Sequence, residues 1–267
     1  MCTKEENVGT NCIIGNPKLI NSKIEFASTA NNNILYCEDG VKIKDSKIVF
    51  QGDNSLIYFS KGKRPLYFAG IVMQHNNVLY TGEELAITGR CRILLYEGKH
   101  LIIGNDCLFA TDVYFRNADP HLIYDVNTKK RMNESKSIFV GDHVWMGQQT
   151  FILKGSKIGS GAIVAGKAVV AGKEIFSNSC WGGNPAKHIS QGIFWLKDTV
   201  HKFKEKESEE SMKYKGDDEF IYQFKKEEAF DYENFEKELN KIEDVRGRLK
   251  YIEENIAGKR EKNRFFI

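Results

Sequence analysis

The chain has 267 residues, of which 41% are apolar, and its 39 basic and 36 acidic side chains leave a formal net charge of +3. This charge is too small to indicate binding to nucleic acid or to an anionic membrane surface. No stretch approaches the roughly twenty apolar residues that span a bilayer, and the first residues contain no apolar signal segment, so we expect a cytoplasmic protein. The six cysteines show no CxxC spacing, and most have apolar neighbours, which indicates reduced thiols.

Residues 8–84 have the composition of short β-strands. The segments CIIGNPKLINSKIEF and GVKIKDSKIVFQGDNSLIYF combine β-branched and aromatic residues with Gly, Asn and Asp, which favour turns. They keep no strict repeat, and we interpret them as the irregular start of the structure that follows.

From Val140 onward the sequence repeats every six residues. Each of the blocks VGDHVW, MGQQTF, ILKGSK, IGSGAI, VAGKAV and VAGKEI opens with a bulky aliphatic residue, and the first five have a small or β-branched residue four positions later. A period of six is not helical, but it fits short strands joined by one tight turn per six residues, with the opening residue inward. The sequence therefore predicts a mainly β fold, a parallel β-helix of three-sided coils over about residues 8–190. A Gly-rich sandwich or α/β protein is the alternative, and six consecutive openers in phase disfavour it.

The repeat stops between about residues 115 and 138. The segment RNADPHLIYD, from Arg116 to Asp125, lies in this gap. We predict a loop that protrudes from the solenoid and presents His121 outside its packed interior, because functional residues are commonly carried on loops held by a rigid scaffold.

After residue 190 we predict a charged, mostly helical extension over residues 191–267. The segment HKFKEKESEESMKYKGDDEF has the composition of a linker or an exposed surface. In YENFEKELNKIEDVRGRLKYIEENI the apolar residues recur at spacings of three and four, which predicts a helix with one apolar stripe. This helix could form a coiled coil with a partner, but the pattern is short and contains Gly247, so we favour packing on its own solenoid or on a neighbouring subunit.

The string VGDHVWMGQQTFILKGSKIGSGAIVAGKAVVAGKEI, followed by GGNPAK, resembles the left-handed β-helix acetyltransferases, the hexapeptide-repeat family. The resemblance covers residues 85–190 most strongly. Within that family, RNADPH followed by GDHVWMG is most similar to bacterial O-acetyltransferases of capsular and other surface polysaccharides, including sialic acid polymers. The resemblance implies left-handed coils in residues 1–190, acetyl-CoA as cosubstrate, and a homotrimer with active sites between adjacent solenoids. The long charged extension is not part of the common pattern.

Acetyl transfer to a sugar hydroxyl requires a base, and histidine can accept a proton near neutral pH. His121 stands at the family's catalytic position, although a lone loop histidine is more often a surface residue. Asp119 would either fix the imidazole tautomer or shape the loop, and Arg116 and Asn117 are candidates for binding the saccharide. Trp145 is expected on an outward face beside the acetyl group and the acceptor sugar, with a subunit interface as its alternative role.

The resemblance also implies a long groove for acetyl-CoA. Backbone N–H groups near Gly147 would stabilise the thioester oxyanion. The residues expected to line the groove are Gly147, Ala165, Gly166, Lys167, Lys173, Pro185, Ala186 and Lys187.

We therefore expect an acetyl-CoA-dependent O-acetyltransferase acting on a bacterial surface saccharide. The alternatives are a transferase acting on a small acceptor such as an amino sugar, serine or an antibiotic, and a non-catalytic β-helix scaffold. A zinc enzyme like the β-helix carbonic anhydrases would need three histidines meeting at the metal, and His121 has no histidine a few residues away, so no metal is expected.

Overall fold

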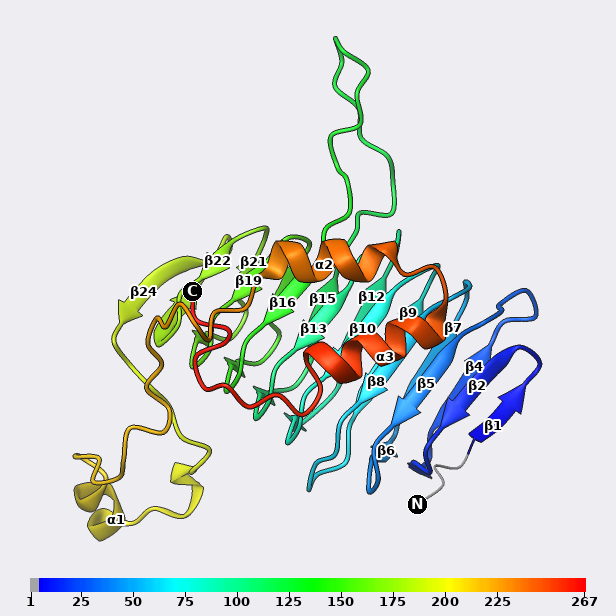
Figure 1. Cartoon of the computed structure of the whole chain (residues 1–267). Helices are drawn as coiled ribbons and strands as arrows, with labels where there is room; N and C mark the ends of the chain where they lie inside the picture. The colour runs from blue at the N-terminus through cyan, green and yellow to red at the C-terminus, as the bar shows by residue number, and fades with distance from the viewer. Residues whose placement is uncertain (1–4) are drawn as a thin grey trace.

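The structure is a computed structural model that describes residues 5–267, and it shows a β-solenoid of about seven turns followed by a few C-terminal helices (Figure 1). The nine-stranded sheet contains, in order, β1 (Glu5–Val8), β2 (Asn11–Ile14), β5 (Ile34–Cys37), β8 (Leu56–Phe59), β10 (Val78–Thr81), β13 (Leu101–Ile103), β16 (Ile138–Val140), β19 (Lys157–Ile158) and β22 (Glu174–Ile175). The seven-stranded sheet contains β4 (Lys23–Phe26), β7 (Lys47–Phe50), β9 (Phe68–Met73), β12 (Cys91–Leu95), β15 (Val113–Arg116), β18 (Phe151–Leu153) and β21 (Val169–Val170).

The third side of the solenoid is a six-stranded sheet. It contains β11 (Ala86–Ile87), β14 (Leu108–Phe109), β17 (Trp145–Met146), β20 (Ile163–Val164), β23 (Ser179–Gly182) and β24 (Lys187–Gln191). In the first coils, β3 (Lys18–Ile20) and β6 (Lys42–Lys44) form a separate two-stranded sheet. Each of them follows a strand of the nine-stranded sheet and precedes a strand of the seven-stranded sheet, as the strands of the six-stranded sheet do in later coils. From β10 to β23, successive strands pass through the three sheets in turn, which confirms the predicted three-sided parallel coils, and β24 then pairs with β23 antiparallel.

The length of a coil changes along the chain. In the nine-stranded sheet, Ile13 pairs with Leu35 and Leu35 with Ile57, so an early coil takes 22 residues. Later, Val140 pairs with Ile158, which is a step of 18 residues. The later step is three times six, whereas the earlier one is not a multiple of six. The early segments therefore lose the six-residue phase although they form regular coils.

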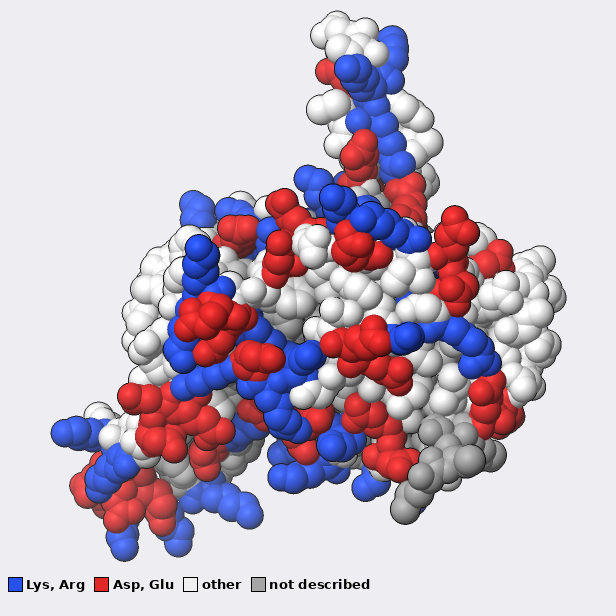
Figure 2. All heavy atoms as spheres, in the orientation of Figure 1, with Lys and Arg blue, Asp and Glu red and all other residues white. Residues whose placement is uncertain are grey.

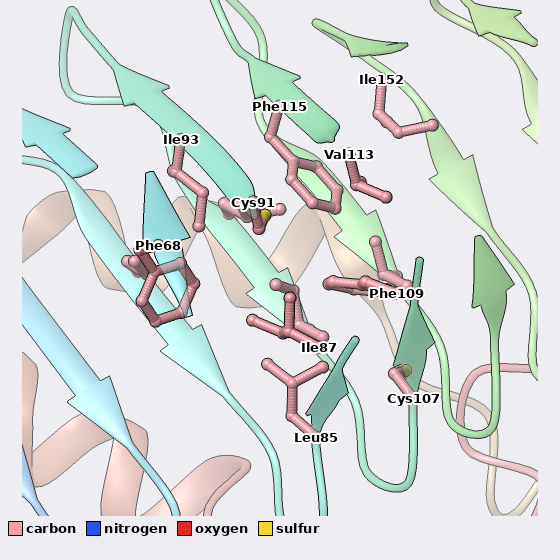
Figure 3. Packing of buried hydrophobic residues seen from close by; sticks show 14 of the residues in the cluster. Phe68, Leu85, Ile87, Cys91, Ile93, Cys107, Phe109, Val113, Phe115 and Ile152 are labelled. Atoms are coloured by element: carbon pink, nitrogen blue, oxygen red, sulfur yellow. The ribbon is translucent and has the colours of Figure 1, made fainter. Parts of the chain in front are cut away.

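The residues that open the six-residue blocks point into the solenoid, as predicted. Val140, Met146, Ile152, Ile158, Val164 and Val170 are all buried. They continue a core that includes aromatic residues of earlier coils, and Figure 3 shows Phe109 and Phe115 inside the coils together with Ile93. Burying one such side chain contributes about 1.5–3 kcal/mol, so the stacked core is the main source of stability.

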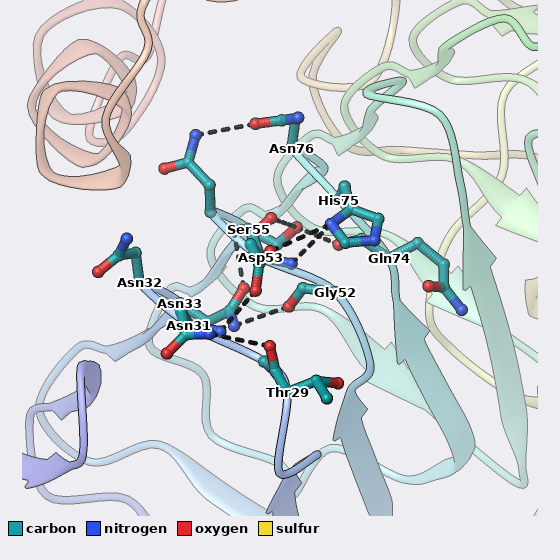
Figure 4. A network of polar contacts seen from close by, with 12 residues as sticks. Thr29, Asn31, Asn32, Asn33, Gly52, Asp53, Ser55, Gln74, His75 and Asn76 are labelled. Carbon is teal, nitrogen blue, oxygen red and sulfur yellow. Dashed lines mark hydrogen bonds and ion pairs between the residues drawn. The ribbon is translucent and has the colours of Figure 1, made fainter.

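Polar side chains are stacked at the corner that precedes the nine-stranded sheet. Asn33 donates to the carbonyl of Gly52 (2.9 Å) and accepts from the backbone of Ser55 (2.9 Å), and the hydroxyl of Ser55 accepts from the backbone of Asn77 (3.0 Å) (Figure 4). These bonds satisfy buried backbone groups that the turns leave unpaired, which explains the Asn and Ser residues that recur along the early coils.

Two of the C-terminal helices pack against the outer face of the nine-stranded sheet (Figure 1). An apolar cluster joins Phe235, Leu239, Leu249 and Ile252 of the helices to Tyr58 and other residues of the sheet. Packing on the chain's own solenoid is thus confirmed, but the predicted single helix is wrong. The chain forms α2 (Tyr232–Lys241) and α3 (Val245–Asn255), because Asp244 caps a new helix by accepting from the backbone of Gly247.

Before these helices the chain makes an excursion that contains η1 (Val200–Lys202) and α1 (Glu205–Glu210). No helix of residues 5–267 combines the length and the apolar character needed to cross a membrane.

Candidate active site

The interruption of the repeat is a loop that projects from the solenoid between β15 and β16 (Figure 1). It spans residues 117–137, slightly less than predicted, because β15 continues to Arg116 and β16 begins at Ile138. Near its tip, Tyr124 pairs with Arg131 in an antiparallel bridge, and the backbone of Asp125 donates to Lys130 (2.9 Å). The loop is therefore a hairpin, and its apolar side chains Leu122, Ile123, Tyr124, Val126 and Met132 are exposed.

His121 lies on the outgoing strand of this loop with an exposed side chain. Its position is fixed by Asn133, which is buried and which donates to the backbone carbonyl of His121 (2.7 Å) and to Asp119 Oδ2 (3.2 Å). Asn133 also accepts from the backbone of Ile123 (3.0 Å). The sequence pattern did not reveal Asn133, because its partners lie ten to fourteen residues away across the hairpin.

Asp119 forms an ion pair with Lys154 (2.6 Å) on the next coil. The hydrogen bonds from Lys154 and Asn133, together with the charge of Arg116, hold the pKa of the Asp119 carboxyl below its usual value. Within residues 5–267 no hydrogen bond joins this carboxylate to the imidazole of His121. Of the two predicted roles for Asp119, shaping the loop is the one that these contacts support.

The base of the loop is held by Glu97. Its carboxylate accepts two hydrogen bonds from Arg131, both 2.8 Å, and a further one from the hydroxyl of Ser135. These contacts lower the pKa of Glu97 to about 2, with the bonds from Arg131 as the largest cause. The bidentate pair ties the returning strand of the loop to the preceding coil.

Asn117 does not lie in a position to bind a saccharide. It is fully buried, and its side-chain amide donates to the carbonyls of Tyr96 and Lys99, both at 3.0 Å, while its oxygen accepts from the backbone of Tyr96 (2.9 Å). Both amide hydrogens are therefore used inside the corner, and this corrects its predicted role. Arg116, the residue before it, is half-buried at the end of β15.

Trp145 is on the six-stranded sheet with its side chain outward. It is 39% exposed, whereas the next residue of β17, Met146, is fully buried. The indole lies beside that of Trp195, with ring centroids 5.8 Å apart. The outward orientation expected for Trp145 is thus present, together with an aromatic neighbour that the sequence analysis treated as part of a charged extension.

The turns at the end of the six-stranded sheet next to the seven-stranded sheet form one stack, which we call the Gly147 corner (residues 147–150, 165–168 and 183–186). The first two turns lead into the seven-stranded sheet, and the third joins β23 to β24. Gly147 lies directly under the next turn, because a Cβ there would approach the backbone nitrogen of Gly166 to 2.4 Å. Lys167 donates through its backbone to Gln148 (2.8 Å) and has a positive φ of 62°. Gly166, Lys167 and Pro185 are exposed, so this corner is open to a ligand.

The backbone N–H of Gly147 itself donates to the carbonyl of Val164 (2.7 Å), so the predicted stabilisation of an oxyanion would have to come from other N–H groups near Gly147. Two other predictions for the cofactor groove need correction. Ala186 is fully buried, so its methyl group packs in the core instead of facing an adenine. Lys173 lies away from Lys167, on the turn between β21 and β22, where its carbonyl accepts from the backbone of Lys157 (3.0 Å). Lys187 is exposed in β24.

The turns between the seven-stranded and nine-stranded sheets form a second stack, the loop corner (residues 117–137, 154–156 and 171–173). A cavity of about 550 Å³ lies here, lined by Asp119, Arg131, Lys136, Lys154 and Gly172 among others. His121 therefore lies at the loop corner of the solenoid. Trp145 lies on the six-stranded sheet and Gly166 at the Gly147 corner, so the seven-stranded sheet separates both of them from His121. One chain does not bring the two halves of the predicted site together.

Two other histidines have structural roles. His100 is buried and bonded to Asn240 (3.0 Å) and to the backbone of Val78 (3.1 Å). His143 is buried between the rings of Trp195 and Phe220. Neither imidazole is accessible to a substrate.

No protein-family model matches the chain. A polysialic acid O-acetyltransferase of Neisseria meningitidis is 33% identical over 198 residues, which cover 74% of this chain and 90% of that protein. A polysialic acid O-acetyltransferase of Escherichia coli O1:K1 / APEC is 37% identical over 154 residues, 58% of this chain and 43% of that protein. Among solved structures, the polySia specific acetyltransferase NeuO superposes with a TM-score of 0.61 at 29% identity, covering 73% of this chain and 90% of that one. The polysialic acid O-acetyltransferase OatWY superposes with a TM-score of 0.54 at 25% identity, covering 70% and 93%.

Proposed function

The chain belongs to the hexapeptide-repeat acetyltransferases, with polysialic acid O-acetyltransferases among its relatives, and from that premise we propose how it works. It transfers the acetyl group of acetyl-CoA to a hydroxyl of an acidic bacterial surface polysaccharide. A capsular polymer of sialic acid is the acceptor that fits the relatives, and His121 is the general base.

The observation that carries this proposal is the division of the site between two corners of one solenoid. His121 projects from the loop corner, while Trp145 and the Gly147 corner lie on the other side of the seven-stranded sheet. We propose a homotrimer in which the loop corner of one subunit meets the Gly147 corner of the next. Such a head-to-tail contact closes into a ring when it is repeated around a threefold axis.

Two surfaces support this assembly. The outer face of the seven-stranded sheet, which would face the axis, carries Val72, Leu94, Tyr114, Phe151 and Leu153, all only half-buried in the single chain. The protruding loop exposes a group of apolar side chains, of which Val126 is 76% exposed. Exposed apolar side chains in such number are typical of a protein–protein contact.

In the reaction, the imidazole of His121 takes the proton of the acceptor hydroxyl as its oxygen attacks the thioester carbonyl carbon. The carbon–sulfur bond then breaks, and the departing thiolate takes the proton from the imidazolium, so that CoA leaves as a thiol and the base is regenerated. Asn133 and the Lys154–Asp119 pair keep this section of the loop in place. Their role is to position the histidine, since a small displacement of a catalytic group is costly.

Acetyl-CoA fits the Gly147 corner by shape and charge. Gly166 and Lys167 are exposed on a turn, and a Cβ at Gly166 would lie 3.3 Å from the carbonyl of Gln148, so the absence of a side chain there leaves the turn open. The ammonium groups of Lys167 and Lys187 are available to the phosphates, and Pro185 offers an apolar surface for the adenine. Lys173, at the loop corner, would approach the cofactor only from a neighbouring subunit.

The experiment that tests this function is an acceptor screen with the purified chain and acetyl-CoA. Release of the CoA thiol is measured with a soluble sialic acid oligomer, and an acetyl ester on the oligomer is identified by mass spectrometry. Thiol release only with an amino sugar, serine or an antibiotic would replace the proposed acceptor. Binding of acetyl-CoA without turnover on any acceptor would favour a non-catalytic scaffold.

A further inference from the structure

Building on the proposed function, we infer that the C-terminal extension forms a second wall of the acceptor site next to Trp145, adapted to an acidic saccharide chain. The extension was expected to be charged and mostly helical. In the structure, residues of its segments 194–198 and 210–215 line, together with Trp145, an open cavity of about 610 Å³. That volume is within the range of about 300–1,000 Å³ usual for ligand sites.

The cavity has an aromatic wall. Trp145 and Trp195 lie side by side with their planes tilted by 43°, and the ring of Phe194 meets that of Tyr214 edge to face, with centroids 4.9 Å apart. Tyr214 is folded back over Gly216, where a Cβ would overlap its phenol ring. Aromatic rings offer a rigid apolar face to the C–H groups of a sugar, and their N–H and O–H groups serve as hydrogen-bond donors.

The wall is fastened to the solenoid at several points. The backbone carbonyl of Trp195 lies 2.9 Å from His143 Nε2, and the indole of Trp195 donates to the carbonyl of His143 (2.9 Å). Asn178 donates to the carbonyls of Ile193 (3.0 Å) and Phe220 (2.8 Å), which holds both ends of the excursion that carries Tyr214. A segment anchored in this way holds a binding surface in one arrangement, so less entropy is lost when a ligand binds.

Two basic side chains at the rim are available to pair with an anionic ligand. Figure 2 shows acidic and basic side chains mixed over the region of α1. Of the charged residues that line the cavity, Glu210 has Lys206 as a partner (3.9 Å), while among residues 5–267 neither Lys213 nor Lys215 forms an ion pair. The lining therefore has two carboxylates, of Asp198 and Glu210, and two ammonium groups without an ion-pair partner among the described residues, of Lys213 and Lys215. A saccharide that carries a carboxylate on each residue would pair with these two lysines.

The test compares three variants with the wild-type trimer, using a soluble sialic acid oligomer as the probe. Tyr214→Ala removes the outer ring, and the double variant Lys213→Glu, Lys215→Glu replaces the two ammonium groups at the rim with carboxylates. The double variant Lys202→Glu, Lys226→Glu makes the same change in net charge at exposed residues outside the cavity. Binding is followed by tryptophan fluorescence without acetyl-CoA, and KM and kcat are then measured with it.

We expect Tyr214→Ala and the rim variant each to raise the Kd and the KM for the oligomer roughly tenfold, with kcat and the KM for acetyl-CoA unchanged. The control variant should behave as wild type. An equal loss in the control would show that only net charge matters, and dissociation of the trimer by Tyr214→Ala would show that a second copy of the chain covers the cavity. Either result would overturn the inference. Because the fluorescence titration requires no acetyl transfer, a failure of the proposed function remains distinguishable from a failure of this subsite.

Discussion

The imidazole of His143 lies flat against the indole of Trp195, with ring centroids 4.0 Å apart and planes inclined by 12°. On its other face it stacks on Phe220 at 3.8 Å, and its Nδ1 lies 2.6 Å from Asp106 Oδ2. His143 is two residues before Trp145 in the same coil. This one side chain therefore links the coil of the candidate site to the extension that covers it.

Replacement of His143 by alanine should loosen the extension. The substitution removes two stacked contacts and leaves the buried carbonyl of Trp195 without its partner, a loss of about 1–3 kcal/mol. Hydrogen exchange of residues 193–222 should accelerate, and the melting temperature should fall. His201→Ala, at an exposed histidine, is the matched control. Unchanged exchange in the His143 variant would mean that the other anchors suffice.

A second prediction concerns acid stability. Burial lowers the pKa of His100 from 6.5 to about 4, because the interior disfavours the charged ring. Between these values the unfolded chain binds a proton that the folded chain does not. Stability should therefore be complete above about pH 6.5 and should decrease as the pH falls toward 4, by roughly 3 kcal/mol at most.

The measurement is the free energy of unfolding in denaturant across that range, with His100→Gln as the comparison. Glutamine keeps an acceptor for the backbone of Val78 and a donor for Asn240, but it does not titrate. The variant should show a flatter pH dependence. Identical slopes in the two proteins would assign the acid sensitivity to other groups.

The regular part of the fold could be predicted because the coils between Val140 and Val170 consist of six-residue blocks that repeat the same inward pattern. The longer early coils carry additional corner residues, so a six-residue repeat does not describe them.

The site was only partly predictable. His121 and Trp145 stand out in the sequence, but Asn133 acts through a partner across the hairpin, and Trp195 acts through His143, which is 52 residues away. Local spacing contains no signal for such pairs, although the aromatic run FWL at residues 194–196 within a charged region was one hint.

The position of Lys173 makes the cofactor groove testable. Lys167→Glu places a negative charge on the Gly147 corner and should weaken CoA binding, measured by calorimetry at low salt, where charge effects are largest. Lys173→Glu makes the same change at the loop corner and should have a smaller effect in the wild-type assembly. Unchanged CoA affinity of the Lys167→Glu variant at low salt would contradict the placement of CoA at the Gly147 corner.

His121→Ala should retain the fold and the affinity for CoA, because the side chain is exposed and contributes little to the core. The rate of acetyl transfer should fall by about a hundredfold to ten-thousandfold, the usual range for the loss of an acid–base catalyst. His121→Asn separates proton transfer from positioning, since asparagine is polar but is not a base near neutral pH. Near-normal turnover of the Asn variant would reduce His121 to a binding residue.

The shared site predicts complementation between two inactive chains. His121→Ala removes the base from the loop corner, and Trp145→Ala removes the indole from the other half of the site. If each site combines the loop of one subunit with the indole of the next, mixed trimers from equal co-expression contain some sites with both residues intact. Random mixing makes this fraction about one quarter, because half of the loops and half of the indoles are wild type.

Acetyl transfer by the purified mixture should therefore recover to roughly a quarter of the wild-type rate, while either variant alone remains inactive. The control for assembly is a chain that carries both substitutions, co-expressed with the wild-type chain. These mixed trimers should also retain a share of activity. A mixture of the two single variants no more active than its components would show that one chain supplies both residues, and the division of the site across the subunit boundary would be wrong.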